Sequence, residues 1–349
     1  MSPRKKLVVV LAATFAVAVA VAGALATSSG QAARSATTTK VAVVTDIGSL
    51  NDKGFNALSA VGLQRAENKL GVDGRIFITQ TAADRQPNLA AAAQQGNDLV
   101  FGVGILFAFG PLPTVAKAFP NTTFAGIDIA QGDMGPTPIP NVRGIVFKEQ
   151  EAGCLVGNIA ALEVKREGKN TISAVGANKV PAIVRFIAGY NFCAKRVTKN
   201  IRVLVNYAND PTFTDQAKCK ATALSQIARG SRVVFQVAGQ CGLGALDAAK
   251  TKGVWGIGVD ADQSFLGRHI LTSARKRVDQ AVYDTIAEYV KDPKGFKGGI
   301  DKTYDVKNGG VGFGRLSPAL PLAVRRAYTK STNALAAQIA SGKLVPPAQ

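Results

Sequence analysis

Short apolar segments alternate with helical segments along this chain, and the alternation occurs twice. The apolar segments of the first half, each of strand length, span residues 40–45, 75–79, 98–103 and 123–127. Those of the second half span residues 171–175, 202–207, 232–237 and 254–259. Buried strands that alternate with helices are typical of a parallel sheet covered by helices on both faces. We therefore expect an α/β protein with two doubly wound parallel-sheet lobes.

The two halves also resemble each other in sequence, which favours duplication of one folding unit. The segment FAGID in the first half mirrors GIGVD in the second, and QQGNDLVFGVG resembles ARGSRVVFQVAG in layout. We expect a first lobe of residues 40–145 with about 266–300, and a second lobe of residues 146–265 with about 301–349.

The last part of the chain is expected to pass between the lobes more than once. It contains a long amphipathic helical pattern at residues 271–290, a strand-like segment at 302–306 and a final helical pattern at 321–342. Several crossings form a hinge about which two lobes can open and close around a ligand. The predicted architecture is thus two lobes joined by a multi-crossing hinge.

The N-terminus has the pattern of a secretory signal peptide. Basic residues at positions 4–6 precede an unbroken apolar run at 7–26, which ends in an A-x-A cleavage pattern. We expect a signal peptide at residues 1–26 and a linker at 27–39. An uncleaved membrane anchor is the alternative, because the run is about long enough to span a bilayer. Either outcome predicts an exported, extracytoplasmic protein, in the periplasm or on the outer face of the membrane. No cysteine for lipid attachment follows the run.

The four cysteines are expected to form disulfides, because an even count in an exported protein favours them. Three connectivities are possible. The helix that enters the second lobe and its first crossover helix should share one face of the sheet, and they carry Cys154 and Cys193. The next two crossover segments should share the other face, and they carry Cys219 and Cys241. This topology favours the pairs Cys154–Cys193 and Cys219–Cys241.

The chain has a formal net charge of +19 at pH 7, but its basic residues do not form a nucleic-acid motif. They are spread along the sequence, with no long basic run interleaved with aromatic residues. A basic soluble surface that faces anionic lipid or cell-wall polymer is the simpler interpretation. We therefore expect no nucleic-acid partner.

The motifs of common enzyme classes are missing from the sequence. There is no G-x-x-x-x-G-K-[ST] phosphate loop and no G-x-S-x-G nucleophile motif. The pair Gly102-x-Gly104 lacks the third glycine of a dinucleotide site, because Phe107 stands there. A single histidine, His269, cannot supply the usual acid–base machinery or a zinc site, although a mechanism with Asp and Lys stays formally possible. We expect a protein without cofactor or metal that is not an enzyme.

Three aspartates stand at the ends of predicted strands. Asp46, Asp128 and Asp260 each follow a strand directly. Ligands of open α/β sheets sit beyond the carboxyl ends of the strands. If the lobes face each other, the three side chains point into one cleft, so the pattern predicts a ligand-binding cleft with acids from both lobes.

The segment TDIGSLNDKGFN at residues 45–56 lies at the mouth of the first strand and opens the first helix. Asn51 or Asp52 can cap that helix, but capping explains only one of the polar residues in the segment. Phe55 offers a flat surface for stacking; packing in the core is the alternative.

This segment resembles TD-x-G-x-x-D-D-K-x-F-N, a motif of the basic membrane protein family of ABC-transporter substrate-binding proteins. FPNTTFAGID, FKEQEAGCLVGNIAAL, VFQVAGQCGLGALDAAK, GIGVDADQ and ILTSARKRVDQAV also follow the order of that family. The resemblance covers nearly the whole chain after the linker, and members of the family resemble bacterial purine nucleoside receptors. It implies a type I periplasmic-binding-protein fold with the ligand between the lobes.

The resemblance also implies which residues form the site. By matching motif, they are Asp46, Asn51, Phe55, Asn56, Asp128, Phe213, Gly239, Asp260 and Lys276. Phe55 and Phe213, one from each lobe, are then expected to flank a purine base. Asp260 and Lys276 are expected to hold the ribose.

Asp128 and Asn56 are expected to form hydrogen bonds with the edge of the base. The sequence departs from the family pattern at two positions, because Asn51 replaces an acid and Cys154 stands where an aromatic residue is usual. Any further apolar wall of the cleft is expected from residues such as Ile105 and Phe107.

The expected function is that of a monomeric extracytoplasmic receptor, which binds a purine nucleoside and delivers it to an ABC permease. Two alternatives stay open. One is a receptor for another small polar ligand, such as a sugar or a signalling molecule. The other is a surface sensory or adhesion protein that uses the same fold, because fold alone does not decide function.

Overall fold

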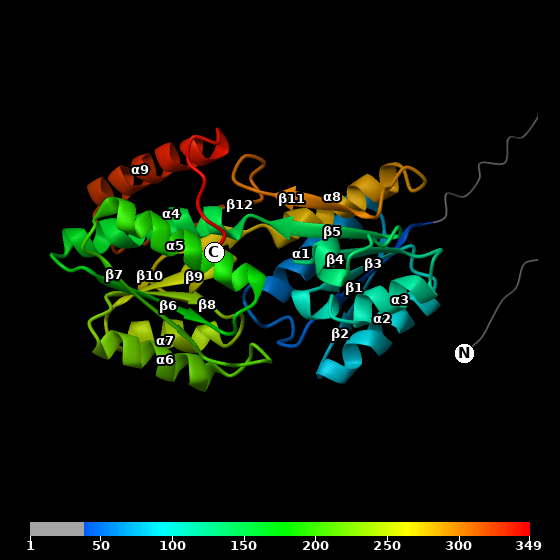
Figure 1. Ribbon diagram of the computed structural model, residues 1–349, viewed down its shortest axis with the longest axis horizontal. Coiled ribbons are helices and arrows are strands. Elements are labelled where there is room, and N and C mark those ends of the chain that lie inside the picture. Colours follow the sequence, from blue (N-terminus) through cyan, green and yellow to red (C-terminus); the bar gives the residue numbers. More distant parts are fainter. Residues whose placement is uncertain (1–37) are drawn as a thin grey trace, which may run out of the picture. The chain divides into compact units, whose positions relative to one another are not determined.

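Residues 38–349, which the computed structural model describes, form two six-stranded sheets (Figure 1). The strand order is β11-β5-β4-β3-β1-β2 in the first sheet and β12-β10-β9-β8-β6-β7 in the second. The predicted signal peptide and most of the predicted linker lie outside the described residues. Within residues 38–349, no helix is long and apolar enough to cross a membrane.

The first lobe is a parallel sheet with helices on both faces. Its strands are β1 (Lys40–Thr45), β2 (Asp73–Ile78), β3 (Leu99–Val103), β4 (Thr123–Ile127), β5 (Val142–Phe147) and β11 (Ile300–Tyr304). Its α-helices are α1 (Phe55–Leu70), α2 (Arg85–Gln94), α3 (Pro111–Ala118) and α8 (Val278–Lys291). Helices α1 and α8 pack together, as do α2 and α3 (Figure 1).

The second lobe repeats this plan, with one antiparallel strand at the edge of its sheet. Its strands are β6 (Thr171–Gly176), β7 (Arg202–Tyr207), β8 (Val233–Val237), β9 (Trp255–Asp260), β10 (Ile270–Lys276) and β12 (Val311–Phe313), and β12 is the antiparallel one. Its α-helices are α4 (Glu149–Arg166), α5 (Pro181–Val197), α6 (Gln216–Ala228), α7 (Gly242–Thr251) and α9 (Leu322–Ala340). The two doubly wound lobes predicted from the sequence are confirmed.

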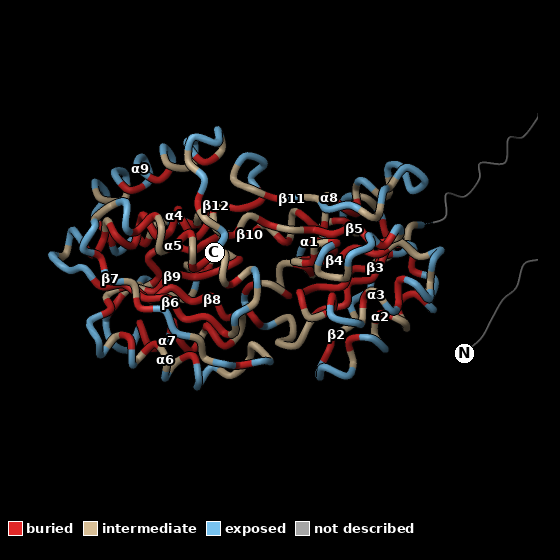
Figure 2. Tube along the Cα trace, in the orientation of Figure 1, coloured by how far each residue is buried: buried red, intermediate tan, exposed pale blue. Residues whose placement is uncertain are grey.

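Burial explains why the strands read as continuous apolar runs. Val41, Val43, Phe101 and Phe235 are fully buried, because helices cover both faces of each sheet. In Figure 2 the central strands are buried along their length, whereas exposed positions gather on the outer sides of the helices and in the loops.

Helices α4 and α5 approach unusually closely, and glycine makes this possible. A Cβ atom at Gly157 would overlap the backbone carbonyl oxygen of Tyr190, and one at Gly153 would overlap that of Phe186. The two helices therefore pack backbone against backbone, which gives the second lobe a rigid layer beside the hinge.

The chain crosses between the lobes three times in the described residues, at β5–α4, β10–α8 and β11–β12. The crossings lie side by side, because the backbone N–H of Lys148 donates to the carbonyl of Tyr304 (2.9 Å), and that of Arg277 to the carbonyl of Gly310 (2.8 Å). The prediction of a multi-crossing hinge is confirmed.

The lobe boundaries predicted for the last part of the chain need correction. Residues 266–300 were expected in the first lobe, but β10 pairs with β9 in the second sheet. Residues 301–349 were expected in the second lobe, but β11 pairs with β5 in the first sheet. The helix expected from residue 271 begins only at Val278, because the preceding segment forms β10. The strand β5 was not identified from the sequence.

Both predicted disulfides are present, and both lie in the second lobe. Cys154–Cys193 joins α4 to α5, and Cys219–Cys241 joins α6 to the residue before α7, with Cα–Cα distances of 4.9 and 5.5 Å. They close loops of 39 and 22 residues, for which chain entropy predicts about 3–4 kcal/mol of stabilisation each.

Candidate ligand-binding site

A cavity lies between the carboxyl ends of the two sheets. It holds about 760 Å³ of space free of protein atoms, a volume that includes its opening to solvent. Both lobes line it. Its charged and aromatic lining residues are Asp46, Asp52, Phe55, Asp128, Phe186, Phe213, Asp260 and Lys276.

The loop between β1 and α1 is held in place by two polar side chains. The Asp52 carboxylate accepts hydrogen bonds from the backbone N–H groups of Gly54 (2.9 Å), Asn56 (2.6 Å) and Ala57 (3.1 Å), so Asp52 caps the start of α1. The Asn56 amide donates to the carbonyls of Asp46 and Ile47 and accepts from the Asp46 N–H. These contacts fix the first turn of α1, where Phe55 lines the cavity.

Aromatic side chains from both lobes face the cavity. Phe55 comes from the first lobe, and Phe213 and Phe186 come from the second. Phe213 follows β7 in a short loop and adopts a left-handed backbone conformation, with φ +61°. Aromatic rings on opposite walls suit a flat apolar ligand group.

Lys276 is a buried cation that joins the two lobes. Its side chain is 3% exposed, and its Nζ lies 2.5 Å from Asp128 Oδ2 in the first lobe and 3.4 Å from Glu149 Oε1 at the start of α4. The second oxygen of Glu149 accepts from Arg185 Nε at 2.6 Å. Burial acts to lower the pKa of Lys276, but the carboxylates of Asp128, Glu149 and Asp260 outweigh it and raise that pKa, so the ammonium stays charged.

Asp260 faces the cavity without a hydrogen-bond or ion-pair partner in the described part of the chain. It is 7% exposed, and no side chain or backbone group among residues 38–349 donates a hydrogen bond to its carboxylate. Burial raises its pKa to about 7, and Lys276 opposes this shift only in part. On the opposite lobe, Asp128 Oδ1 is fully buried and has no hydrogen-bond partner among residues 38–349. The cavity therefore presents an unpaired acceptor at Asp260, while the other lobe contributes Asp128, whose Oδ2 is already bound by Lys276.

Strained backbone marks the same residues. Asp128 (φ +62°), Asp260 (φ +61°) and Phe213 (φ +61°) all adopt left-handed conformations that residues other than glycine rarely take. Such strain persists where the surrounding structure imposes it and gathers at functional sites. Here it turns three side chains at the ends of strands or loops toward one cavity.

The structure brings most of the predicted site residues together. Those that line the cavity are Asp46, Phe55, Asn56, Asp128, Phe213, Gly239, Asp260 and Lys276. Asn51 is exposed and lies outside the lining. Asp46 is already paired with Arg85 at 2.8 Å, and the polar atoms of Asn56 are occupied by the loop backbone.

One expected detail of the charged residues differs in the structure, and several wall residues were missed, among them Phe186 and Gln240. Lys276, which is expected with Asp260 at the ribose, forms its ion pairs with Asp128 and Glu149, and no ion pair joins it to Asp260 within residues 38–349. Ile105 lines the cavity as expected, whereas Phe107 is fully buried beside it. The missed Phe186 lies on α5 with no motif around it. Gln240 was also missed, although it directly follows the predicted Gly239.

Comparison with known proteins agrees with this arrangement. Residues 39–344 match the Bmp family, described as ABC transporter substrate-binding protein PnrA-like. The chain is 35% identical over 334 residues to the ABC transporter nucleoside-binding protein BmpA of Lactococcus lactis subsp. cremoris, covering 89% of this chain and 92% of that relative. It is 28% identical over 312 residues to basic membrane protein A1 of Borrelia garinii subsp. bavariensis, covering 88% of each.

A solved structure shares the fold. An ABC transporter system solute-binding protein from Aeropyrum pernix K1 superposes with a TM-score of 0.76 at 29% identity, covering 88% of this chain and 94% of that chain. With two parallel-sheet lobes, a cavity between them and a family match that extends from β1 to the end of α9, the chain belongs to the Bmp family of ABC transporter substrate-binding proteins, which bind their substrates and are not enzymes.

Proposed function

We propose that this protein is an exported receptor that binds a purine nucleoside between its lobes and delivers it to an ABC permease. The observation that carries the proposal is one cavity lined by aromatic rings from opposite lobes, Phe55 and Phe213, and by the carboxylates of Asp128 and Asp260, of which Asp260 has no hydrogen-bond donor among residues 38–349. The name of the Lactococcus relative, a nucleoside-binding protein, supports it.

The aromatic rings suit the base of a nucleoside. A purine between Phe55 and Phe213 would gain stacking energy on both faces, and stacking is worth about 1–3 kcal/mol per base. A free sugar has no flat aromatic group and would contact the rings only through its C–H groups. The proposal therefore favours a nucleoside over a monosaccharide.

The carboxylates suit the donors of a nucleoside. Ribose hydroxyls and base N–H groups can donate to the carboxylates of Asp260 and Asp128, and hydrogen bonds to charged acceptors are the stronger kind. Lys276 has three N–H donors, of which two point to Asp128 and Glu149, so a third remains for a ligand oxygen.

The same charges should exclude phosphate. Three carboxylates, those of Asp128, Glu149 and Asp260, surround the cavity end of Lys276, and the only other cation paired within this cluster, among residues 38–349, is Arg185. A nucleotide would bring further negative charge into a buried acidic site, which is unfavourable without an additional cation. Nucleotides should bind far more weakly than nucleosides.

Calorimetry with inosine, guanosine, adenosine, ribose and inosine monophosphate tests the proposal. Wild type should bind at least one nucleoside, and ribose and the nucleotide should bind weakly or not at all. Phe55→Ala should weaken nucleoside binding by about 1–3 kcal/mol through lost stacking. Asp260→Asn at pH 8 should weaken it by about 1.5–3 kcal/mol through a lost charged acceptor.

Phe109→Ala is the matched control, because Phe109 is 63% exposed and lies outside the cavity lining. It should bind as wild type does. If wild type binds no nucleoside, the proposed function is wrong. If Phe55→Ala and Asp260→Asn bind as tightly as the control, the assignment of the site residues is wrong.

A further inference from the structure

We propose that the disulfide Cys219–Cys241 is a positioning element of the ligand site, which holds Phe213 against the cavity and thereby sets ligand affinity. This inference rests on the proposed function, because it takes Phe213 as a wall for the ligand. It assigns to one of the two disulfides a role in binding that the other does not have.

The disulfide ties together the two segments that make this wall. Cys219 lies in the first turn of α6, just after the loop that carries Phe213. Cys241 directly follows Gly239 and Gln240, which line the cavity. The N–H of Cys241 donates to the carbonyl of Phe213 at 2.8 Å, so the sulfur bridge and a backbone hydrogen bond hold the same two segments together.

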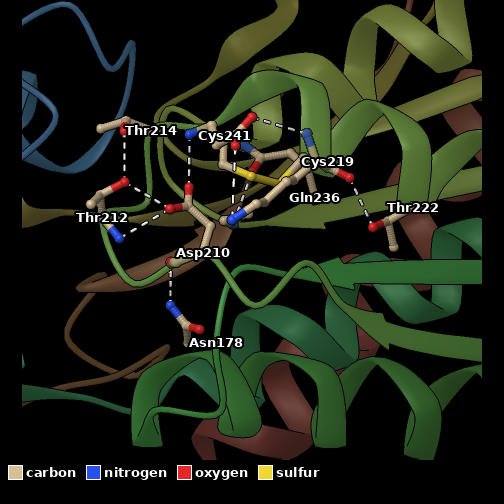
Figure 3. Close-up of a disulfide and its surroundings, with 11 residues drawn as sticks. Asn178, Asp210, Thr212, Thr214, Cys219, Thr222, Gln236 and Cys241 are labelled. Carbon is tan, nitrogen blue, oxygen red and sulfur yellow. Dashed lines mark hydrogen bonds and ion pairs between the residues drawn. A yellow bond between two sulfur atoms is a disulfide. The ribbon is translucent and has the colours of Figure 1, made fainter.

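The loop that carries Phe213 is fixed on its other side by Asp210 (Figure 3). Asp210 is 2% exposed, and its carboxylate accepts from the N–H (3.0 Å) and hydroxyl (2.7 Å) of Thr212 and from the N–H of Asp215 (2.7 Å). The N–H of Phe213 donates to the Asp210 carbonyl at 3.3 Å. Asn178 donates to the same carbonyl.

Close packing leaves Phe213 little freedom between these two restraints. Its φ of +61° is unfavourable for a residue with a side chain, so the loop needs outside contacts to keep it. A Cβ atom at Gly239 would lie 3.3 Å from Phe213 Cβ, which shows how tightly the two cavity segments meet. Without the disulfide, one of the restraints on a strained residue is lost.

The second disulfide provides a matched control. Cys154–Cys193 also lies in the second lobe and closes a longer loop, of 39 residues against 22, so its removal should cost at least as much stability. Its sulfurs pack with Leu155 and Ile339 in a cluster separate from the cavity, and neither cysteine lines the cavity.

The test compares inosine binding by calorimetry in two double variants, Cys219→Ala/Cys241→Ala and Cys154→Ala/Cys193→Ala, at a temperature where both are folded. All four cysteines are almost fully buried, so alanine is tolerated sterically. The first double variant should bind at least about fivefold more weakly, which corresponds to the lower end of the stacking contribution of one ring. The second should change by less than about twofold.

A third comparison shows whether the effect acts through Phe213. In a Phe213→Ala background, removal of Cys219–Cys241 should change inosine affinity by less than about twofold, because the ring that it positions is gone. The Asp210 carboxylate restrains the same loop by a different set of contacts. Asp210→Asn should therefore weaken inosine binding in the wild-type background and change it little in the Phe213→Ala background. An equal loss of affinity in both disulfide variants, or an undiminished loss in the Phe213→Ala background, would overturn the inference.

Amide hydrogen exchange gives a readout that needs no ligand. Exchange at residues 212–215 should rise in the Cys219→Ala/Cys241→Ala variant and stay at the wild-type rate in the other. If wild type binds none of inosine, guanosine and adenosine, the proposed function fails, and exchange still decides the positioning role. Unchanged exchange in the first variant would refute that role even if wild type binds inosine.

Discussion

Replacing Asp260 by asparagine should make the unliganded protein more stable while it weakens ligand binding. Asp260 is buried at the cavity wall without a donor among the described residues, and burial raises its pKa from 3.8 to about 7. At about 1.4 kcal/mol per pKa unit, a shift of this size corresponds to about 4 kcal/mol that ionised Asp260 costs the folded protein above pH 7. Asparagine carries no charge and avoids this penalty.

The stability that Asp260→Asn gains over wild type should increase as the pH rises. Between pH 4 and 7, native Asp260 holds a proton that the unfolded chain has released, so the native state binds more protons and wild-type stability falls as pH rises through this window. From pH 5 to pH 8, wild type should lose about 2–3 kcal/mol through Asp260 that Asp260→Asn does not lose. Urea unfolding at the two pH values, followed by circular dichroism, measures the difference.

Asp262→Asn is the control, because this substitution should change the free energy of unfolding in the opposite direction. Burial acts to raise the pKa of Asp262, but hydrogen bonds from Arg315 and Ser264 outweigh it and hold that pKa below its usual value. This variant should be less stable than wild type at pH 8, and the deficit should vanish as the pH falls through the pKa of Asp262. If Asp260→Asn shows a stability difference that does not grow from pH 5 to pH 8, the electrostatic argument for the cavity is wrong.

Three further predictions concern the hinge, the helix packing and the ligand. Lys276→Met should lower the free energy of unfolding by about 3–5 kcal/mol at pH 8, because it leaves Asp128 buried without its cation. The urea midpoint measures this, and a deficit no smaller at pH 5 would contradict it. Gly157→Ala should destabilise by about 1–3 kcal/mol through overlap with Tyr190, and an unchanged Tm would refute the packing argument. Inosine should lower the radius of gyration in small-angle scattering, whereas no change would count against hinge closure.

Loops of the two lobes contact each other at positions that such closure would affect. Gln263 Nε2 in the second lobe donates to the carbonyl of Lys53 in the first, at 3.1 Å. A Cβ atom at Gly48 in the first lobe would lie 3.8 Å from Gln240 Oε1 and Thr214 Cγ2 in the second. Loops from opposite lobes thus meet at the edge of the cavity.

The repeated strand–helix pattern predicted both sheets, but it failed at a strand whose apolar residues have a spacing that also fits a helix. The segment that forms β10 has apolar residues at Ile270, Leu271, Ala274 and then Val278 of α8, a spacing that also fits a helix. Both faces of β10 are buried, so no alternation of polar and apolar residues marks it as a strand. Its Thr272 is buried too and donates to the carbonyl of Gly314.

The sequence predicted those residues of the candidate site that stand at the ends of strands. Asp128 and Asp260 line the cavity because parallel strands end at the same edge of a sheet. The partner of Lys276 was not predictable in this way. Asp128 lies 148 residues away in the other lobe. Whether Lys276 pairs with Asp128 or with Asp260 depends on how the two lobes meet. Phe186 was missed because a cavity-lining aromatic residue inside a helix has the same local pattern as a core residue.

A crystal structure of the protein with a bound purine nucleoside tests the central claim most directly. We expect the base between Phe55 and Phe213, a ribose hydroxyl within hydrogen-bond distance of an Asp260 carboxylate oxygen, and a ligand donor at the Asp128 carboxylate. Density for the nucleoside outside this cavity, or a cavity that stays empty of ligand at saturating nucleoside, would contradict the claim.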